Sequence, residues 1–136
     1  MKARDLKLDK YSISKLTYRE LKYFCLQYPE KRRKLADLRG LGAQQYSGMP
    51  HSPGVSDPVG EKGAKAAALS RDTDMIEAAA QEASPSDWRG LLKNVTEEGR
   101  GYWYLRCHDL VSCGETTFYR RRRLFFHLLA QRKELI

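Results

Sequence analysis

Apolar side chains recur along this chain at spacings of three and four residues, and this periodicity constrains the fold more than any other feature. Side chains at these spacings lie on one face of an α-helix. The clearest sets are Leu21, Phe24, Cys25 and Tyr28, and then Trp88, Leu91, Leu92 and Val95. No segment of useful length alternates apolar and polar residues in the manner of a strand. The sequence therefore predicts an all-α protein.

The first helix is predicted to begin at Thr17. Thr17 and Glu20 have the spacing of a capping box, and Leu16 and Leu21 have that of a hydrophobic staple. Pro29 disfavours helical geometry at the preceding residue, so we expect the helix to break or kink there. The segment "EKRRKLADLR" then predicts a short basic helix that completes an N-terminal helical segment over residues 1–39.

Residues 40–56 contain no charged residue but include four glycines and two prolines, which predicts a flexible loop. Asp57 and Pro58 then have the character of the N-cap and first residue of a long helix that ends near Ala83. Four of its acidic residues are expected to form a solvated face: Asp72, Asp74, Glu77 and Glu82. Small and apolar residues follow an approximate heptad seam that could pack within the chain or across a homodimer: Ala66, Leu69, Thr73, Ile76, Ala80 and Ala83.

The charge is unevenly distributed. The chain carries a formal net charge of +8. Residues 1–39 hold 12 Lys and Arg against 5 Asp and Glu, residues 57–99 hold 5 against 9, and residues 100–136 hold 8 against 3. Two basic ends thus flank an acidic middle, which indicates nucleic acid as the first partner to consider.

Other bulk features narrow the class of protein. No apolar run approaches the roughly 20 residues of a spanning helix, and the N-terminus lacks a signal-peptide pattern. Three cysteines at irregular spacing favour reduced thiols, as in a cytoplasmic protein. We expect no membrane association.

The C-terminal third predicts a tri-helical, helix-turn-helix unit. A helix over about residues 86–95 is followed by a turn, a short helix "YWYLRCH", a second turn and a long final helix. Ser112 with Glu115 offers a capping box for that last helix, and Gly114 is an alternative N-cap. We expect residues 57–136 to form one unit containing the long helix and this motif.

Four consecutive arginines in the final helix do not share one face. At 100° per residue, the apolar arc centres on Phe118, and Thr116, Arg120, Arg123 and His127 lie opposite. Arg121 and Arg122 fall inside the apolar arc. These two are expected either to brace the DNA backbone or to pair internally.

This division suits DNA recognition. A guanidinium can bond guanine O6 and N7 together, so Arg120 and Arg123 are predicted to enter a groove with Thr116 and Thr117. On the preceding helix, phosphate contacts are predicted for Arg100, Arg106 and Tyr102. The alternative is that the basic face is only a solvated helix exterior.

Several stretches together resemble a family of small phage and prophage proteins similar to the ArpU/RinA-type regulators of late transcription. They are "YRELKYFCLQYPEKRRKL", "MPHSPGVSDPVGEKGAKAAALSRDTDMIEAAAQEA", "LLKNVTEEGRGYWYL" and "CGETTFYRRRRLFFHLLAQ". The likeness to the small phage family covers residues 17–131, and the likeness to the regulators covers about residues 88–131. The "TTFYRRRR" run is similar to the start of their recognition helix, which is like the helix-turn-helix of sigma-factor region 4.

The resemblance implies a transcription regulator in the bacterial cytoplasm, associated with the nucleoid. It implies DNA-facing roles for Thr116, Thr117, Tyr119, Arg120 and Arg123, and a core role for Phe118. The sequence departs from the pattern at Gly114, where a Ser-like cap is usual, and at Leu110, where a turn Gly is usual.

We predict neither catalysis nor a bound metal or cofactor. Cys107, His108 and Cys113 lack a fourth ligand at zinc-like spacing. Core packing is the simpler role for Cys25 and Cys107. Among the aromatics at 102–104, which could stack on bases, at least one is expected in the core.

Three functions are consistent with these patterns. The first is a sequence-specific regulator that binds double-stranded DNA and contacts RNA polymerase. The second is a phage DNA-packaging or assembly adaptor that oligomerises and binds DNA loosely. The third is an interaction protein whose basic ends meet an acidic partner.

Overall fold

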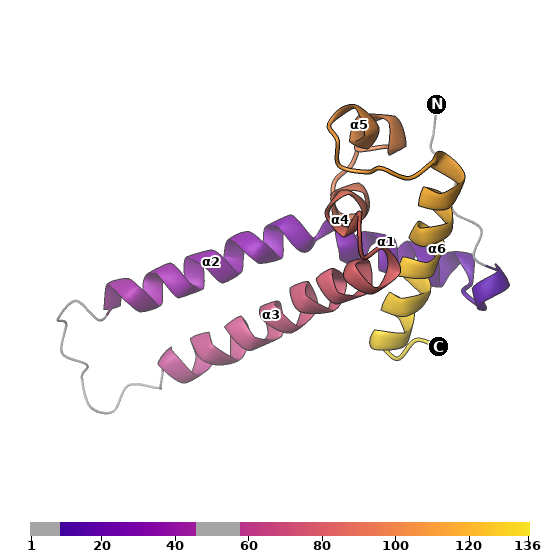
Figure 1. Ribbon diagram of the computed structural model, residues 1–136. Helices are drawn as coiled ribbons and strands as arrows, with labels where there is room; N and C mark the ends of the chain where they lie inside the picture. Colours follow the sequence, from indigo (N-terminus) through magenta and orange to yellow (C-terminus); the bar gives the residue numbers. More distant parts are fainter. Residues whose placement is uncertain (1–8, 46–57) are drawn as a thin grey trace.

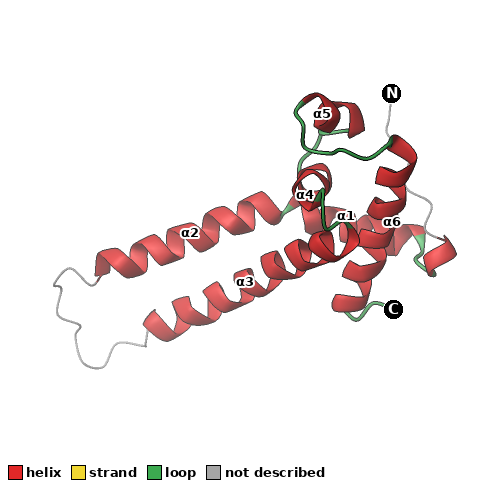
Figure 2. Cartoon of the chain, in the orientation of Figure 1, coloured by secondary structure: helices red, strands yellow, loops and turns green. Residues whose placement is uncertain are grey.

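The structure, a computed structural model, describes residues 9–45 and 58–136, and within them every regular element is helical (Figures 1 and 2). No strand occurs in these two ranges, so the prediction of an all-α protein is confirmed. The elements are η1 (Asp9–Tyr11), α1 (Lys15–Leu26), α2 (Tyr28–Gln45), α3 (Pro58–Ala83), α4 (Trp88–Thr96), α5 (Tyr102–Cys107) and α6 (Glu115–Arg132).

Helices α2 and α3 lie side by side as an antiparallel arm that projects from the other helices (Figure 1). Leu35 of α2 is buried. Lys31 Nζ lies 3.0 Å from Asp72 Oδ2, and the Tyr28 hydroxyl donates a hydrogen bond to Glu77. The expectation that the carboxylates of α3 form a solvated face is therefore wrong for Asp72 and Glu77, which pair with the basic helix beside them.

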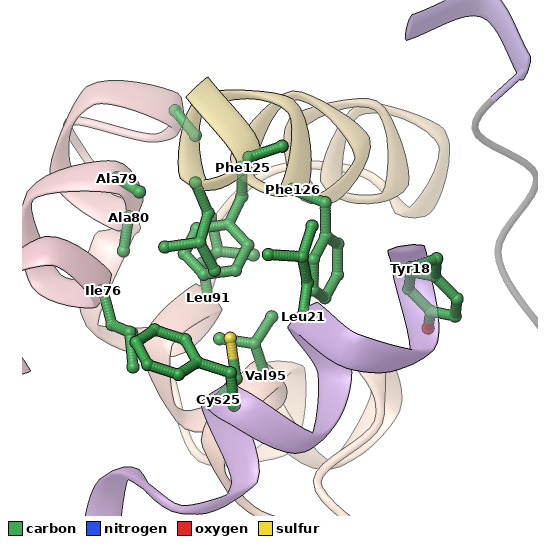
Figure 3. Close-up of a cluster of buried hydrophobic side chains, with 14 of the residues drawn as sticks. Tyr18, Leu21, Cys25, Ile76, Ala79, Ala80, Leu91, Val95, Phe125 and Phe126 are labelled. Atoms are coloured by element: carbon green, nitrogen blue, oxygen red, sulfur yellow. The ribbon is translucent and has the colours of Figure 1, made fainter. Parts of the chain in front are cut away.

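The remaining helices enclose one core, in which α6 crosses the C-terminal half of α3 while α1 and α4 pack alongside (Figure 3). Alanines 79 and 80 of α3 are fully buried, and such small side chains let two helix backbones approach closely. The labelled core side chains are Tyr18, Leu21, Cys25, Ile76, Ala79, Ala80, Leu91, Val95, Phe125 and Phe126.

Helix α1 begins earlier than predicted. Ser14 is its N-cap, and the Ser14 hydroxyl accepts a hydrogen bond from the Thr17 N–H at 3.1 Å. Leu16 is 76% exposed, so it forms no staple with Leu21. A second hydroxyl three residues upstream, rather than Thr17 itself, thus caps the helix. The predicted inner face is confirmed, since Leu21 and Cys25 are fully buried.

The predicted break near Pro29 is confirmed, because α1 ends at Leu26 and α2 begins at Tyr28. The loop predicted for residues 40–56 is wrong at its start, where α2 continues to Gln45. Glycine costs a helix roughly 1 kcal/mol relative to alanine, and pairing with α3 outweighs that cost. Residues 46–57, including the predicted cap Asp57, lie outside the described ranges.

The predicted seam of α3 packs within the chain. Thr73, Ile76, Ala80 and Ala83 are buried in the core, and Ala66 and Leu69 are half-buried on the arm. The long helix itself is confirmed from Pro58 to Ala83.

Candidate nucleic-acid interface

Three helices follow the arm at the predicted positions. Helix α4 spans Trp88–Thr96, α5 spans Tyr102–Cys107 and α6 spans Glu115–Arg132. Helix α4 begins two residues later than predicted. Asp87 is its N-cap residue, and the Asp87 carboxylate makes no capping bond. Instead, Asp87 Oδ1 accepts hydrogen bonds from the N–H of Ser112 at 3.2 Å and from its hydroxyl at 3.1 Å.

Gly114, the alternative predicted N-cap, is the N-cap of α6, and it makes no side-chain capping bond. The predicted Ser112–Glu115 capping box does not form, because the Ser112 hydroxyl bonds to Asp87. The inner face of α6 is as predicted: Phe118, Phe125, Phe126 and Leu129 are buried. The recognition-helix candidate is thus held in the core along most of its length.

Arg121 and Arg122 pair internally, which was one of the two predicted alternatives, and they do not lie free for DNA. Arg121 Nη1 lies 3.6 Å from Asp87 Oδ2 and donates to the Ser84 hydroxyl at 3.4 Å. Arg122 Nε donates to Asn94 Oδ1 at 2.7 Å, and its guanidinium lies 5.1 Å from the centre of the Phe126 ring. Both side chains connect α6 to the α3–α4 region.

The other predicted DNA-facing residues of α6 lie on or next to the side of the helix away from the core, which we call the outer strip. Thr116 and Arg120 are exposed, whereas Thr117, Tyr119 and Arg123 are half-buried. Neither Arg120 nor Arg123 forms an ion pair with another described residue. No described carboxylate therefore neutralises these two guanidinium groups, and their charge can attract a partner outside the chain.

This strip is shorter than the sequence predicts. The ring of His127, which lies further along the same face, packs 4.9 Å from the ring of Tyr11. The segment around η1 thereby covers the C-terminal part of the outer face, and Ile13 beside it is buried in the core. No local pattern in the sequence indicates this contact, since the two rings lie more than a hundred residues apart.

The phosphate contacts predicted for Tyr102, Arg106 and Arg100 have different outcomes, and Arg100 lies two residues before α5 rather than on it. Tyr102 is buried and its hydroxyl donates to the Cys113 carbonyl at 2.7 Å, so its predicted phosphate contact is wrong. Arg106 is exposed and donates to the Ser112 carbonyl at 3.0 Å. Arg100 is half-buried, 3.6 Å from Glu97 Oε1 and 4.5 Å from the centre of the Tyr104 ring. Trp103 is 66% exposed.

The cysteines do not share one environment. Cys25 is buried, as predicted, but Cys107 is exposed, so its predicted core role is wrong. Burial raises the pKa of the Cys25 thiol strongly.

Among the described residues, no three His, Cys, Asp or Glu side chains come together as metal ligands would. None of the described helices combines the length and apolarity needed to cross a bilayer.

Ion pairs between distant parts of the sequence neutralise some of the basic side chains, so the unpaired positive charge is distributed differently from the charge along the sequence. Lys31 pairs with Asp72, Arg32 with Glu77 and Arg132 with Glu82. The acidic middle of the sequence therefore neutralises part of each basic end.

Comparison with protein-family models, with curated proteins and with solved structures found no match to this chain.

Proposed function

We propose that the protein is a sequence-specific, duplex-DNA-binding transcription regulator that inserts the first half of α6 into the major groove. The observation that supports this most is the exposure of Arg120 on a helix whose opposite side is locked in the core. An α-helix fits the major groove, and a guanidinium carried by a helix that is fixed in the core can read guanine there. Thr116 lies one turn before Arg120 and adds a methyl and a hydroxyl to the same strip.

The remaining arginines have separate roles in this proposal. Arg123 extends the strip, and Arg106 meets a backbone phosphate. Arg121 and Arg122 act as supports that hold α6 against Asp87 and Asn94. RNA polymerase is the proposed protein partner, and the nucleoid of a bacterium carrying a phage or prophage is the proposed location. Both follow from the resemblance to the late-transcription regulators.

The experiment that tests the proposal is selection of bound sequences from random duplex DNA at moderate salt. An enriched sequence is expected, and its affinity should fall steeply as salt rises because bound phosphates release counterions. Arg120→Ala should then lose about 10-fold or more of the preference for the selected duplex over a scrambled one.

Arg33→Ala is the matched control, because it removes one exposed arginine from the arm rather than from α6. It should retain the full preference. Equal loss of preference in both variants, or no enriched sequence at all, would count against the proposal.

A second candidate is the assembly adaptor, which one feature of the arm favours. An apolar groove of about 470 Å³ opens between α2 and α3, lined by Leu38, Ala68 and Leu69 with charged residues at its rim. Apolar surface of this kind is typical of interfaces between subunits. Light scattering separates the candidates: a ring of many copies indicates the adaptor, and a monomer or dimer indicates the regulator. Absence of DNA retention at low salt would instead favour the interaction protein.

A further inference from the structure

An exposed aromatic residue and an exposed basic residue lie close together on α5, beside the start of α6. Trp103 is 66% exposed, and Arg106 follows it by three residues, which places both on adjoining parts of one helix side. Leu16 and Tyr23, the other large apolar side chains of helices that are more than half exposed in the described ranges, belong to α1. Trp103 is thus separate from them and next to the proposed recognition helix.

A short series of contacts connects Trp103 to the first turn of α6. The Trp103 ring packs edge-on against the Tyr102 ring, with centroids 5.0 Å apart. The Tyr102 ring lies 5.7 Å from that of Phe118, and its hydroxyl bonds to the Cys113 carbonyl. Arg106 bonds to the Ser112 carbonyl two residues before the N-cap of α6. The indole and the guanidinium therefore flank the end of α6 that would enter a groove.

We propose that Trp103, with Arg106 beside it, binds the deoxyribose-phosphate backbone that borders this groove. This inference rests on the proposed function and adds a contact that reads no sequence. A DNA strand alternates apolar sugars with anionic phosphates, and an exposed indole offers an apolar face and one N–H donor. Arg106 supplies the charge for the phosphate oxygens. In the part of the chain that the structure describes, Arg106 is exposed and donates to a backbone carbonyl rather than to a carboxylate.

The chain contains only two tryptophans, and this makes the contact measurable. Trp88→Phe leaves Trp103 as the only indole, and Trp103→Phe leaves the half-buried Trp88. On addition of duplex DNA to the full-length chain, the emission of Trp103 should shift to shorter wavelength. Its quenching by acrylamide should fall about twofold or more, because the bound strand covers the ring. The emission of Trp88 should not change.

Affinity provides the second measurement. Trp103→Ala should weaken binding to the selected and the scrambled duplex by the same factor, about 10-fold, which is near the lower end of the loss when a ring that stacks on a base is truncated. Trp103→Phe retains a ring but loses the N–H donor, so its loss should be smaller. Tyr23→Ala removes a comparably exposed ring from α1 and should not change affinity. Circular dichroism verifies that each variant is folded.

The outcomes separate this inference from the proposed function. If the unmodified protein binds duplex DNA but Trp103 stays open to acrylamide in the complex, this inference is wrong and the proposed function stands. A loss confined to the selected duplex would also overturn it, because Trp103 would then read bases. If the unmodified protein binds no duplex at low salt, both are wrong.

Discussion

The carboxylate of Asp87 accepts hydrogen bonds from both the backbone N–H and the hydroxyl of Ser112. Asp87 stands at the start of α4, whereas Ser112 precedes α6, so the pair fixes the turn that leads into the proposed recognition helix. Arg121 of α6 joins the same carboxylate at 3.6 Å. One buried acid thus positions both the entry to α6 and its second turn.

Removal of the Asp87 carboxylate should therefore destabilise the protein. Asp87→Ala leaves the Ser112 N–H and the Arg121 guanidinium without their acceptor, and we expect the free energy of unfolding to fall by about 2–4 kcal/mol. Urea unfolding measures the change. Asp74→Ala is the control, because Asp74 is exposed and, among the described residues, its carboxylate accepts a hydrogen bond from the Ser70 hydroxyl alone. A similar loss in both variants would contradict a special role for Asp87.

Gly90 is predicted to be a position where any side chain is costly. A Cβ there would lie 2.3 Å from the Leu110 carbonyl oxygen and 2.7 Å from Val111 Cγ1. Because the nearest atom belongs to backbone, Gly90→Ala should force the α5–α6 connection outward and cost about 1–3 kcal/mol in thermal or urea unfolding.

Gly63 supplies the matched comparison. It lies in the interior of α3, and a Cβ there would meet nothing within 4 Å. Gly63→Ala should stabilise the protein by up to about 1 kcal/mol through helix propensity alone. Opposite signs for the two substitutions are expected, and a Gly90→Ala variant as stable as the unmodified protein, or more stable, would show that Gly90 is not closely packed.

Arg122 and Asn94 should be energetically coupled. Their side chains bond at 2.7 Å between α6 and α4, and both are partly buried. In a double-mutant cycle with Arg122→Ala and Asn94→Ala, we expect a coupling of about 0.5–3 kcal/mol in the free energy of unfolding. A parallel cycle with Arg120→Ala and Asn94→Ala should be additive, since Arg120 is exposed on the outer strip. Additivity in the first cycle would remove Arg122 as a support of α6.

Alkaline conditions should weaken the fold through Cys25. Burial raises the pKa of this thiol above its ordinary value of 9.0, so the unfolded chain releases the proton first as the pH rises. The stability that the neutral thiol contributes is complete below about pH 9 and declines above it, by at most about 1.4 kcal/mol per pH unit.

Cys25→Ala should show a shallower decline between about pH 9 and pH 10, although it is less stable at neutral pH because of the cavity. Burial and the bond to Glu77 raise the pKa of Tyr28 above its ordinary 10.0, so any decline common to both proteins at higher pH has a second source. Urea unfolding across this range measures the difference. Identical slopes in the two proteins would exclude Cys25 as the cause.

Local pattern was sufficient to predict that the helices exist and which side of α1 and of α6 faces inward. Leu21 and Cys25 on α1, and Phe118 and Phe125 on α6, are buried where the periodicity predicts, because a helical face depends only on residues three or four positions apart. The same reasoning correctly separated Arg120, which is exposed, from Arg121 and Arg122, which lie toward the core.

The tertiary structure alone decided the partners of those side chains. Arg121 meets Asp87, Arg122 meets Asn94, and Tyr11 covers His127, and in each case the two residues lie far apart in the sequence. Helix α2 likewise continues through a predicted loop because α3 packs beside it. Periodicity describes one helix at a time, whereas charge pairing and coverage depend on how helices meet. The extent of the proposed DNA-binding strip was therefore set by contacts that no local pattern contains.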